Sequence, residues 1–153
     1  LCHDHSKPLD PTALLAKQTP FYRQAERIAI NRTVAGVHYP TDSMAGAVLG
    51  VSMAEALVNL LDEREETTAR SFNGRNYEGD FNLALMSEQI ADKKGAITET
   101  KVKIDPSVVP DWLRTMWGKA LTAMPKISRE DWDGLDLVSR WLIATRSAVI
   151  VMT

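Results

Sequence analysis

The longest apolar stretch of the chain, residues 44–61, most limits what the chain can fold into. Its polar members are few, and one of them, Glu55, would lie in the middle of the membrane if the stretch crossed a bilayer. Because a charged side chain there is costly, we interpret the stretch as a core helix of a protein that is not transmembrane. Pro40 suits the first position of a helix, so we expect this helix to run from there to about Leu61.

Small residues form a row on one face of this predicted helix. Gly46, Gly50 and Ala54 are spaced four apart, which places them on successive turns of the same face. A row of this kind lets the backbone of a second helix come close. We therefore expect the 40–61 helix to be the central helix of the fold.

Apolar residues also recur at helical spacing elsewhere. They predict helices at residues 21–34 and 81–91, from Asp111 onwards, and from Ser128 onwards, whereas only residues 96–104 alternate as a strand would. We therefore predict an all-α fold. Residues 1–153 would form a single helical domain or the C-terminal part of one, with site-bearing helices in residues 1–66 and an irregular segment plus C-terminal helices in residues 67–153.

Length and composition place the chain among ordinary globular proteins. It has 153 residues, enough for one domain with a continuous core, and 44% of them are hydrophobic and 25% charged. The net charge of −2 gives no reason to expect nucleic acid or an anionic membrane surface as a partner. Cys2 is the only cysteine, which excludes an internal disulfide and leaves the compartment open, with the periplasm and secretion among the options.

Residues 31–50, NRTVAGVHYPTDSMAGAVLG, concentrate groups that suit anion chemistry. Arg32 offers a planar, permanently charged fork for a tetrahedral oxyanion, and the first N–H groups of the helix at Pro40 form a ready anion site. Gly36 would let backbone N–H groups come close to a ligand. His38 lies between these features. Asp42, one helical turn further on, would fix the tautomer of His38 and raise its nucleophilicity.

As a unit, Arg32, His38 and Asp42 in the spacing Arg-x5-His-x3-Asp resemble the third signature motif of a known superfamily. This is the superfamily of type 2 phosphatidic acid phosphatases and vanadium-dependent haloperoxidases. The flanking residues fit as well, from the glycine before the histidine through His-Tyr-Pro to the small residues that follow. Asn31 stands where the motif usually has serine. The resemblance covers residues 21–56, about a quarter of the chain.

The resemblance implies a helical bundle with an oxyanion site between its helices. Arg32 and Gly36 would then contribute to binding phosphate or vanadate. His38 would be the phosphorylated nucleophile of a phosphatase that hydrolyses small phosphate esters, or the vanadium ligand of a haloperoxidase that uses a halide and a peroxide, and Asp42 would orient it. Vanadate is the cofactor only in the second case. The motif does not separate the two activities, and no other metal site is expected.

The two earlier motifs of the superfamily, one with Lys and Arg-Pro and one reading Pro-Ser-Gly-His, are absent from the sequence. The second of them supplies the general-acid histidine. Because these motifs are missing and the first residue is Leu1, we expect the chain to be the C-terminal part of a longer polypeptide. The alternatives are that a second chain of the same assembly carries the missing motifs, or that they are lost altogether. A homo-oligomer is left open. The alternative is a non-catalytic helical subunit that keeps the motif as scaffold and docks a partner through its Trp-rich C-terminal half.

Two other groups of residues are candidates for a metal site and for substrate binding. The four potential ligands in residues 2–5, Cys-His-Asp-His, are too closely spaced to wrap around one metal ion, and a chain end is a poor place for such a site. The tryptophans read as core or interface anchors rather than as substrate-binding residues; they are Trp112, Trp117, Trp132 and Trp141.

Overall fold

The computed structural model describes residues 10, 20–91, 95–123, 126–136, 138–139 and 150–152. The helices in these ranges are α2 (Pro20–Val34), α3 (Pro40–Leu61), α4 (Leu83–Ala91), α5 (Asp111–Ala123) and α6 (Arg129–Gly134), with the 3-10 turns η1 (Gly74–Asn76) and η2 (Pro106–Val108). The strands are β1 (Glu66–Phe72), β2 (Ile97–Lys103), β3 (Lys126–Ser128) and β4 (Ile150–Met152).

The prediction of an all-α fold is wrong, because the chain is mixed α/β. Strands β1 and β2 pair antiparallel over their whole length, from Glu66 opposite Lys103 to Phe72 opposite Ile97. Strands β3 and β4 form a second, parallel pair. The strand expected within residues 96–104 is confirmed as β2, whereas β1, β3 and β4 were not predicted. Strand β4 lies in the segment for which C-terminal helices were expected.

The polarity of its buried residues explains why β1 was missed. The two buried positions of this strand are Thr67 and Thr68 rather than apolar residues. Both are satisfied by distant side chains, since Asn59 Nδ2 donates to Thr67 Oγ1 at 3.2 Å and Lys101 Nζ donates to Thr68 Oγ1 at 2.7 Å. A local pattern of apolar residues cannot reveal a strand held in this way.

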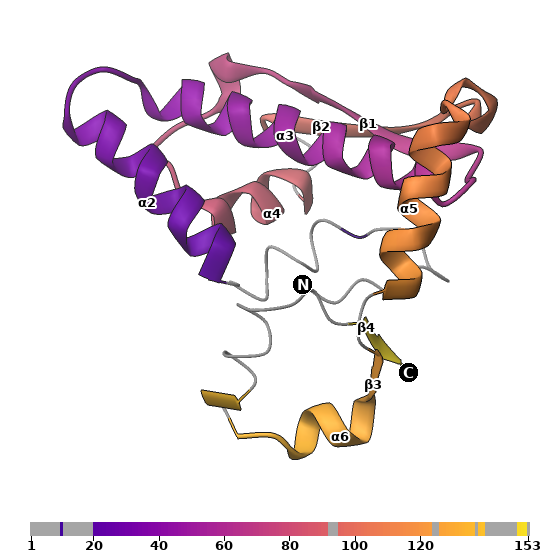
Figure 1. The fold of residues 1–153 in the computed structure, drawn as a ribbon. Helices are drawn as coiled ribbons and strands as arrows, with labels where there is room; N and C mark the ends of the chain where they lie inside the picture. Colours follow the sequence, from indigo (N-terminus) through magenta and orange to yellow (C-terminus); the bar gives the residue numbers. More distant parts are fainter. Residues whose placement is uncertain are drawn as a thin grey trace.

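Helix α3 is the longest element, and other elements gather around it (Figure 1). It packs against β1, while α2 and α4 also contact it. Helix α5 is held near its middle, where Trp117 Nε1 donates to Asp62 Oδ1 at 3.0 Å. The buried apolar core joins α3 to α4, β2 and the segment between η1 and α4; it consists of Met44, Val48, Tyr77, Phe81, Met86, Ala96 and Ile97.

The buried side of α3 mixes apolar and polar residues, with Met44 and Val48 beside a carboxylate and an amide. Glu55 and Asn59 lie on its buried side, and its exposed side carries Leu49, Met53 and Leu57. By length and composition alone, α3 could also cross a membrane. That the chain is not transmembrane stays a prediction.

The row of small residues on α3 lies on its exposed side, contrary to our expectation that it would receive another helix. Gly46, Gly50 and Ala54 are all exposed. A Cβ atom built at either glycine would meet no atom within 4 Å in the part of the chain that the structure describes. The central position of α3 therefore rests on its opposite, buried face.

Candidate functional site

Gly36 ends helix α2 in a left-handed conformation, with φ of 70°. Its N–H donates to the carbonyl of Thr33 at 2.9 Å, and the Val37 N–H donates to the carbonyl of Arg32 at 3.1 Å. This is the Schellman pattern of helix ends, in which glycine avoids the steric penalty that a side chain would bring. In this conformation both N–H groups are bonded within the protein. That Gly36 also contributes to binding an anion stays a prediction.

Asp42 supplies a negative charge to the N-terminal end of α3. Its Oδ2 atom accepts the Tyr39 N–H at 3.3 Å, and the N–H groups of Asp42 and Ser43 donate to the carbonyl of Tyr39 at 3.1 and 3.3 Å. Pro40 has no N–H to offer. The positive end of the helix dipole is therefore already matched by a carboxylate of the protein itself. This turn offers fewer free donors to an anion than its sequence suggests.

His38 and Asp42 are brought together, as their spacing predicts. His38 Nδ1 lies 3.5 Å from Asp42 Oδ2, and the two side chains are 38% and 54% exposed. A charge-assisted N–H···O bond measures about 2.7–2.9 Å, so this contact orients the imidazole without holding it tightly. Within the described residues, nothing bonds the Nε2 atom of His38, and it is the atom that would face a ligand.

Arg32 lies in the last turn of α2 and is exposed. Its guanidinium makes no hydrogen bond or ion pair with any residue of the described ranges. The Schellman turn joins the end of α2 to the start of α3, so Arg32 and His38 belong to the same end of the helix pair (Figure 1). One guanidinium and one imidazole fit part of the surroundings that phosphate or vanadate needs, and further donors would have to come from elsewhere.

The described residues contain no group of three or more His, Cys, Asp and Glu side chains that could hold a metal ion. The possible metal ligands of residues 2–5 lie outside the described residues. Of the four tryptophans, Trp112 is exposed and Trp117 is half-buried with its indole N–H bound to Asp62. The side chains of Trp132 and Trp141 are also outside the described part of the chain.

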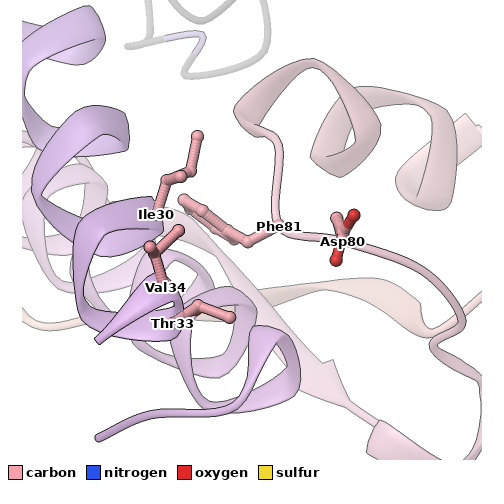
Figure 2. Close-up of a pocket in the computed structure, with 5 residues that line it drawn as sticks. All are labelled: Ile30, Thr33, Val34, Asp80 and Phe81. Atoms are coloured by element: carbon pink, nitrogen blue, oxygen red, sulfur yellow. The ribbon is translucent and has the colours of Figure 1, made fainter. Parts of the chain in front are cut away.

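A cavity of about 270 Å³ lies between α2 and the segment that precedes α4 (Figure 2). It is lined by Ile30, Thr33, Val34, Asp80 and Phe81. Nothing in the sequence pointed to it, because its two walls are almost fifty positions apart in the chain. An α-helix turns by about 100° per residue, which puts Arg32 about 150° around α2 from the middle of the lining residues. The cavity and the Arg32–His38–Asp42 group are therefore separate places.

Comparison with known proteins adds no relative: no family model, no curated protein and no solved structure matches this chain.

Proposed function

We propose that the chain carries part of an oxyanion-binding active site of the phosphatase and haloperoxidase type, with Arg32, His38 and Asp42 as its contribution. The contact between His38 Nδ1 and Asp42 Oδ2 carries this proposal. A neutral imidazole with its proton on Nδ1 would donate to this carboxylate, and the lone pair of Nε2 would then be available to a phosphorus or vanadium atom. The guanidinium of Arg32, which has no partner among the described residues and lies at the same end of the helix pair, suits the oxygens of that group.

In a phosphatase, Nε2 of His38 would form a bond to phosphorus while the bond to the ester oxygen breaks. The leaving oxygen then needs a proton, and water later releases the phosphate from the imidazole. None of the three residues is an acid placed to give that proton. The general acid is therefore assigned to the expected upstream part or second chain, and the present chain alone should turn over slowly. In a haloperoxidase, vanadate bound at the same residues would activate the peroxide.

Binding of vanadate, followed by ⁵¹V NMR, tests the proposal without requiring turnover. We expect His38→Ala and Arg32→Ala each to weaken binding at least tenfold, and Asp42→Ala to weaken it less. Arg27→Ala is the matched control, because Arg27 is also an exposed arginine of α2 and should leave binding unchanged. Equal binding by the wild type and the His38→Ala variant would exclude the site.

Hydrolysis of a phosphate ester, assayed beside bromide oxidation with and without vanadate, separates the two activities. Vanadate inhibits a phosphatase by occupying the phosphate site, whereas a haloperoxidase requires it. Both assays should be repeated with any co-purifying polypeptide present.

The second candidate function is a non-catalytic helical module, and a specific observation favours it. Gly36 and Asp42 each have a complete structural role without a ligand, since one ends α2 and the other caps α3. The exposed apolar side of α3 and the exposed Trp112 would then serve a partner. A mass spectrum of the native material discriminates: a second polypeptide with the Lys/Arg-Pro and Pro-Ser-Gly-His segments supports the enzyme, and an unrelated stoichiometric partner supports the module.

A further inference from the structure

We propose that the cavity between α2 and residues 80–81 binds a small organic ammonium ion, meaning a cationic amine with a compact apolar body. The cavity volume of about 270 Å³ is just below the range of about 300–1,000 Å³ that is usual for small-molecule pockets. This proposal does not depend on the proposed function, because none of its residues belongs to the Arg32–His38–Asp42 group.

The lining of the cavity is apolar apart from one hydroxyl and one carboxylate. Figure 2 shows Ile30 and Val34 on α2 facing the ring of Phe81. The hydroxyl is that of Thr33, and Asp80 is the only charged lining residue. An apolar wall with a single negative charge selects a cation that carries apolar surface, and it disfavours anions of the same shape.

Contacts within the protein hold the two walls in place. Glu26 Oε1 on α2 accepts the Leu83 N–H at 2.9 Å, which ties α2 to the opposite wall. Phe81 belongs to the buried core and is 6% exposed. The Tyr77 hydroxyl donates to the Asp80 carbonyl at 3.0 Å and so fixes the backbone of that residue. Because the walls are already ordered, binding of a ligand costs little conformational entropy.

Asp80 and Phe81 together supply the two groups that recognise ammonium ions. Within the described residues, the Asp80 carboxylate has no hydrogen-bond or ion-pair partner, so it is available to a ligand N–H. The face of an aromatic ring attracts a cation by about 0.5–2 kcal/mol, depending on solvent exposure. Thr33 Oγ1 donates to the Ala29 carbonyl at 3.5 Å and keeps a lone pair on the α2 side of the lining.

A set of three probes with the same phenylethyl body tests the charge requirement. Amide signals of the ¹⁵N-labelled full chain are followed by NMR while 2-phenylethylammonium, neutral 2-phenylethanol or anionic 3-phenylpropionate is added. We expect saturable shifts at residues 30–34 and 80–83 with the ammonium, binding at least tenfold weaker with the alcohol, and no saturable shift with the carboxylate. Absence of saturable shifts with the ammonium, or equal affinity for all three probes, would overturn the proposal.

Variants of exposed residues locate the effect without threatening the fold. Asp80→Asn should lower the affinity for the ammonium to that for the alcohol, whereas Glu78→Gln, at an exposed carboxylate two positions away, should not change it. Val34 is 81% exposed, so Val34→Lys places a cation at the cavity with little strain and should abolish binding. An ammonium affinity that is the same in the wild type and in Asp80→Asn also contradicts the proposal. Vanadate binding should be unaltered in all three variants, which keeps the two proposals separate.

Discussion

Glu55 and Arg70 form an ion pair that is almost completely removed from water. Glu55 Oε2 lies 2.7 Å from Arg70 Nη1, and both side chains are 3% exposed. Arg70 Nε also donates to Glu99 Oε1 at 2.8 Å, and Glu99 is the residue opposite Arg70 on β2. One guanidinium therefore links α3 to both strands of the antiparallel sheet. Glu55 lies on the same inward face of α3 as the core residues Met44 and Val48.

Removing one partner of this pair should destabilise the fold strongly. In Glu55→Gln the Arg70 charge stays buried with only Glu99 to balance it, and we expect the free energy of unfolding to fall by about 3 kcal/mol. Urea denaturation followed by circular dichroism measures this. The matched control is Glu65→Gln, an exposed carboxylate that should change stability by less than about 0.5 kcal/mol.

A double variant separates the charge effect from packing. Glu55→Met combined with Arg70→Met leaves no unpaired buried charge, because the remaining Glu99 is 33% exposed. It should regain at least half of the stability lost in Glu55→Gln, since apolar replacements of buried ion pairs are often neutral or stabilising. A double variant that is less stable than Glu55→Gln would contradict this expectation. It would show that the ion pair stabilises the fold more than apolar side chains do at the same two positions.

Two glycines offer a test of backbone conformation in which the expected signs are opposite. Gly36 has φ of 70° and no atom within 4 Å of an added Cβ, so Gly36→Ala should lower stability by about 1 kcal/mol through conformational strain alone. Gly46 lies inside α3 with equally open space, and Gly46→Ala should raise stability by about 0.5–1 kcal/mol because alanine favours helix. Equal effects at the two positions would contradict the Schellman assignment of Gly36.

The helices could be predicted from sequence because their signals are local. Pro40 at the first position of α3 and the helical spacing after Asp111 both act within a few residues. Strand β1 depends instead on a strand that begins about 25 positions later and on polar contacts with α3. The inward position of Glu55 was also hidden, since its buried partner Arg70 comes from a strand that was not predicted.

The candidate site and the cavity also combine features that depend on neighbouring residues with features that depend on distant segments. The contact between His38 and Asp42 joins residues only four positions apart at the start of α3, so it could be predicted from the sequence. Where Arg32 points depends on the angle that the Gly36 turn imposes between α2 and α3, which no local pattern fixes. The cavity next to Phe81 joins residues from distant segments, and its carboxylate, Asp80, looks like an ordinary turn residue in the sequence.

Gly74 packs against the start of α3, and an added methyl group there should clash. A Cβ at this position would lie 2.8 Å from Cγ2 of Thr41 and 3.5 Å from a ring carbon of Phe72. We expect Gly74→Ala to destabilise the fold by about 1–3 kcal/mol, as overpacking usually does.

A second substitution tests whether the Thr41 methyl group causes this loss. Thr41→Ser removes Cγ2 and should restore about 1 kcal/mol in the Gly74→Ala background, whereas Thr41→Val keeps a methyl group there and should restore nothing. A double-mutant cycle from thermal or urea unfolding gives the coupling energy between the two positions. A coupling of zero with serine would place the strain elsewhere.

Tyr77 should make stability fall at alkaline pH. Burial, and secondly the negative charge of Asp80, raise the pKa of the Tyr77 phenol above its ordinary value of about 10. The unfolded chain therefore loses this proton first as the pH rises, so the stabilisation is complete below pH 10 and is lost as the pH passes through the folded-state pKa. Unfolding free energies measured between pH 9 and 11 should decline, and absorbance at 295 nm should show late ionisation of this tyrosine.

Two variants assign this pH dependence to its causes. Tyr77→Phe should reduce the alkaline decline without abolishing it, because burial also raises the pKa of Tyr22. The same variant should lose about 1 kcal/mol at neutral pH through the missing bond to the Asp80 carbonyl. Asp80→Asn should lower the pKa of Tyr77 only part of the way, since burial is the larger cause. If the unfolding free energy falls as steeply at alkaline pH in Tyr77→Phe as in the wild type, a group other than Tyr77 causes the fall. The prediction for Tyr77 would then be wrong.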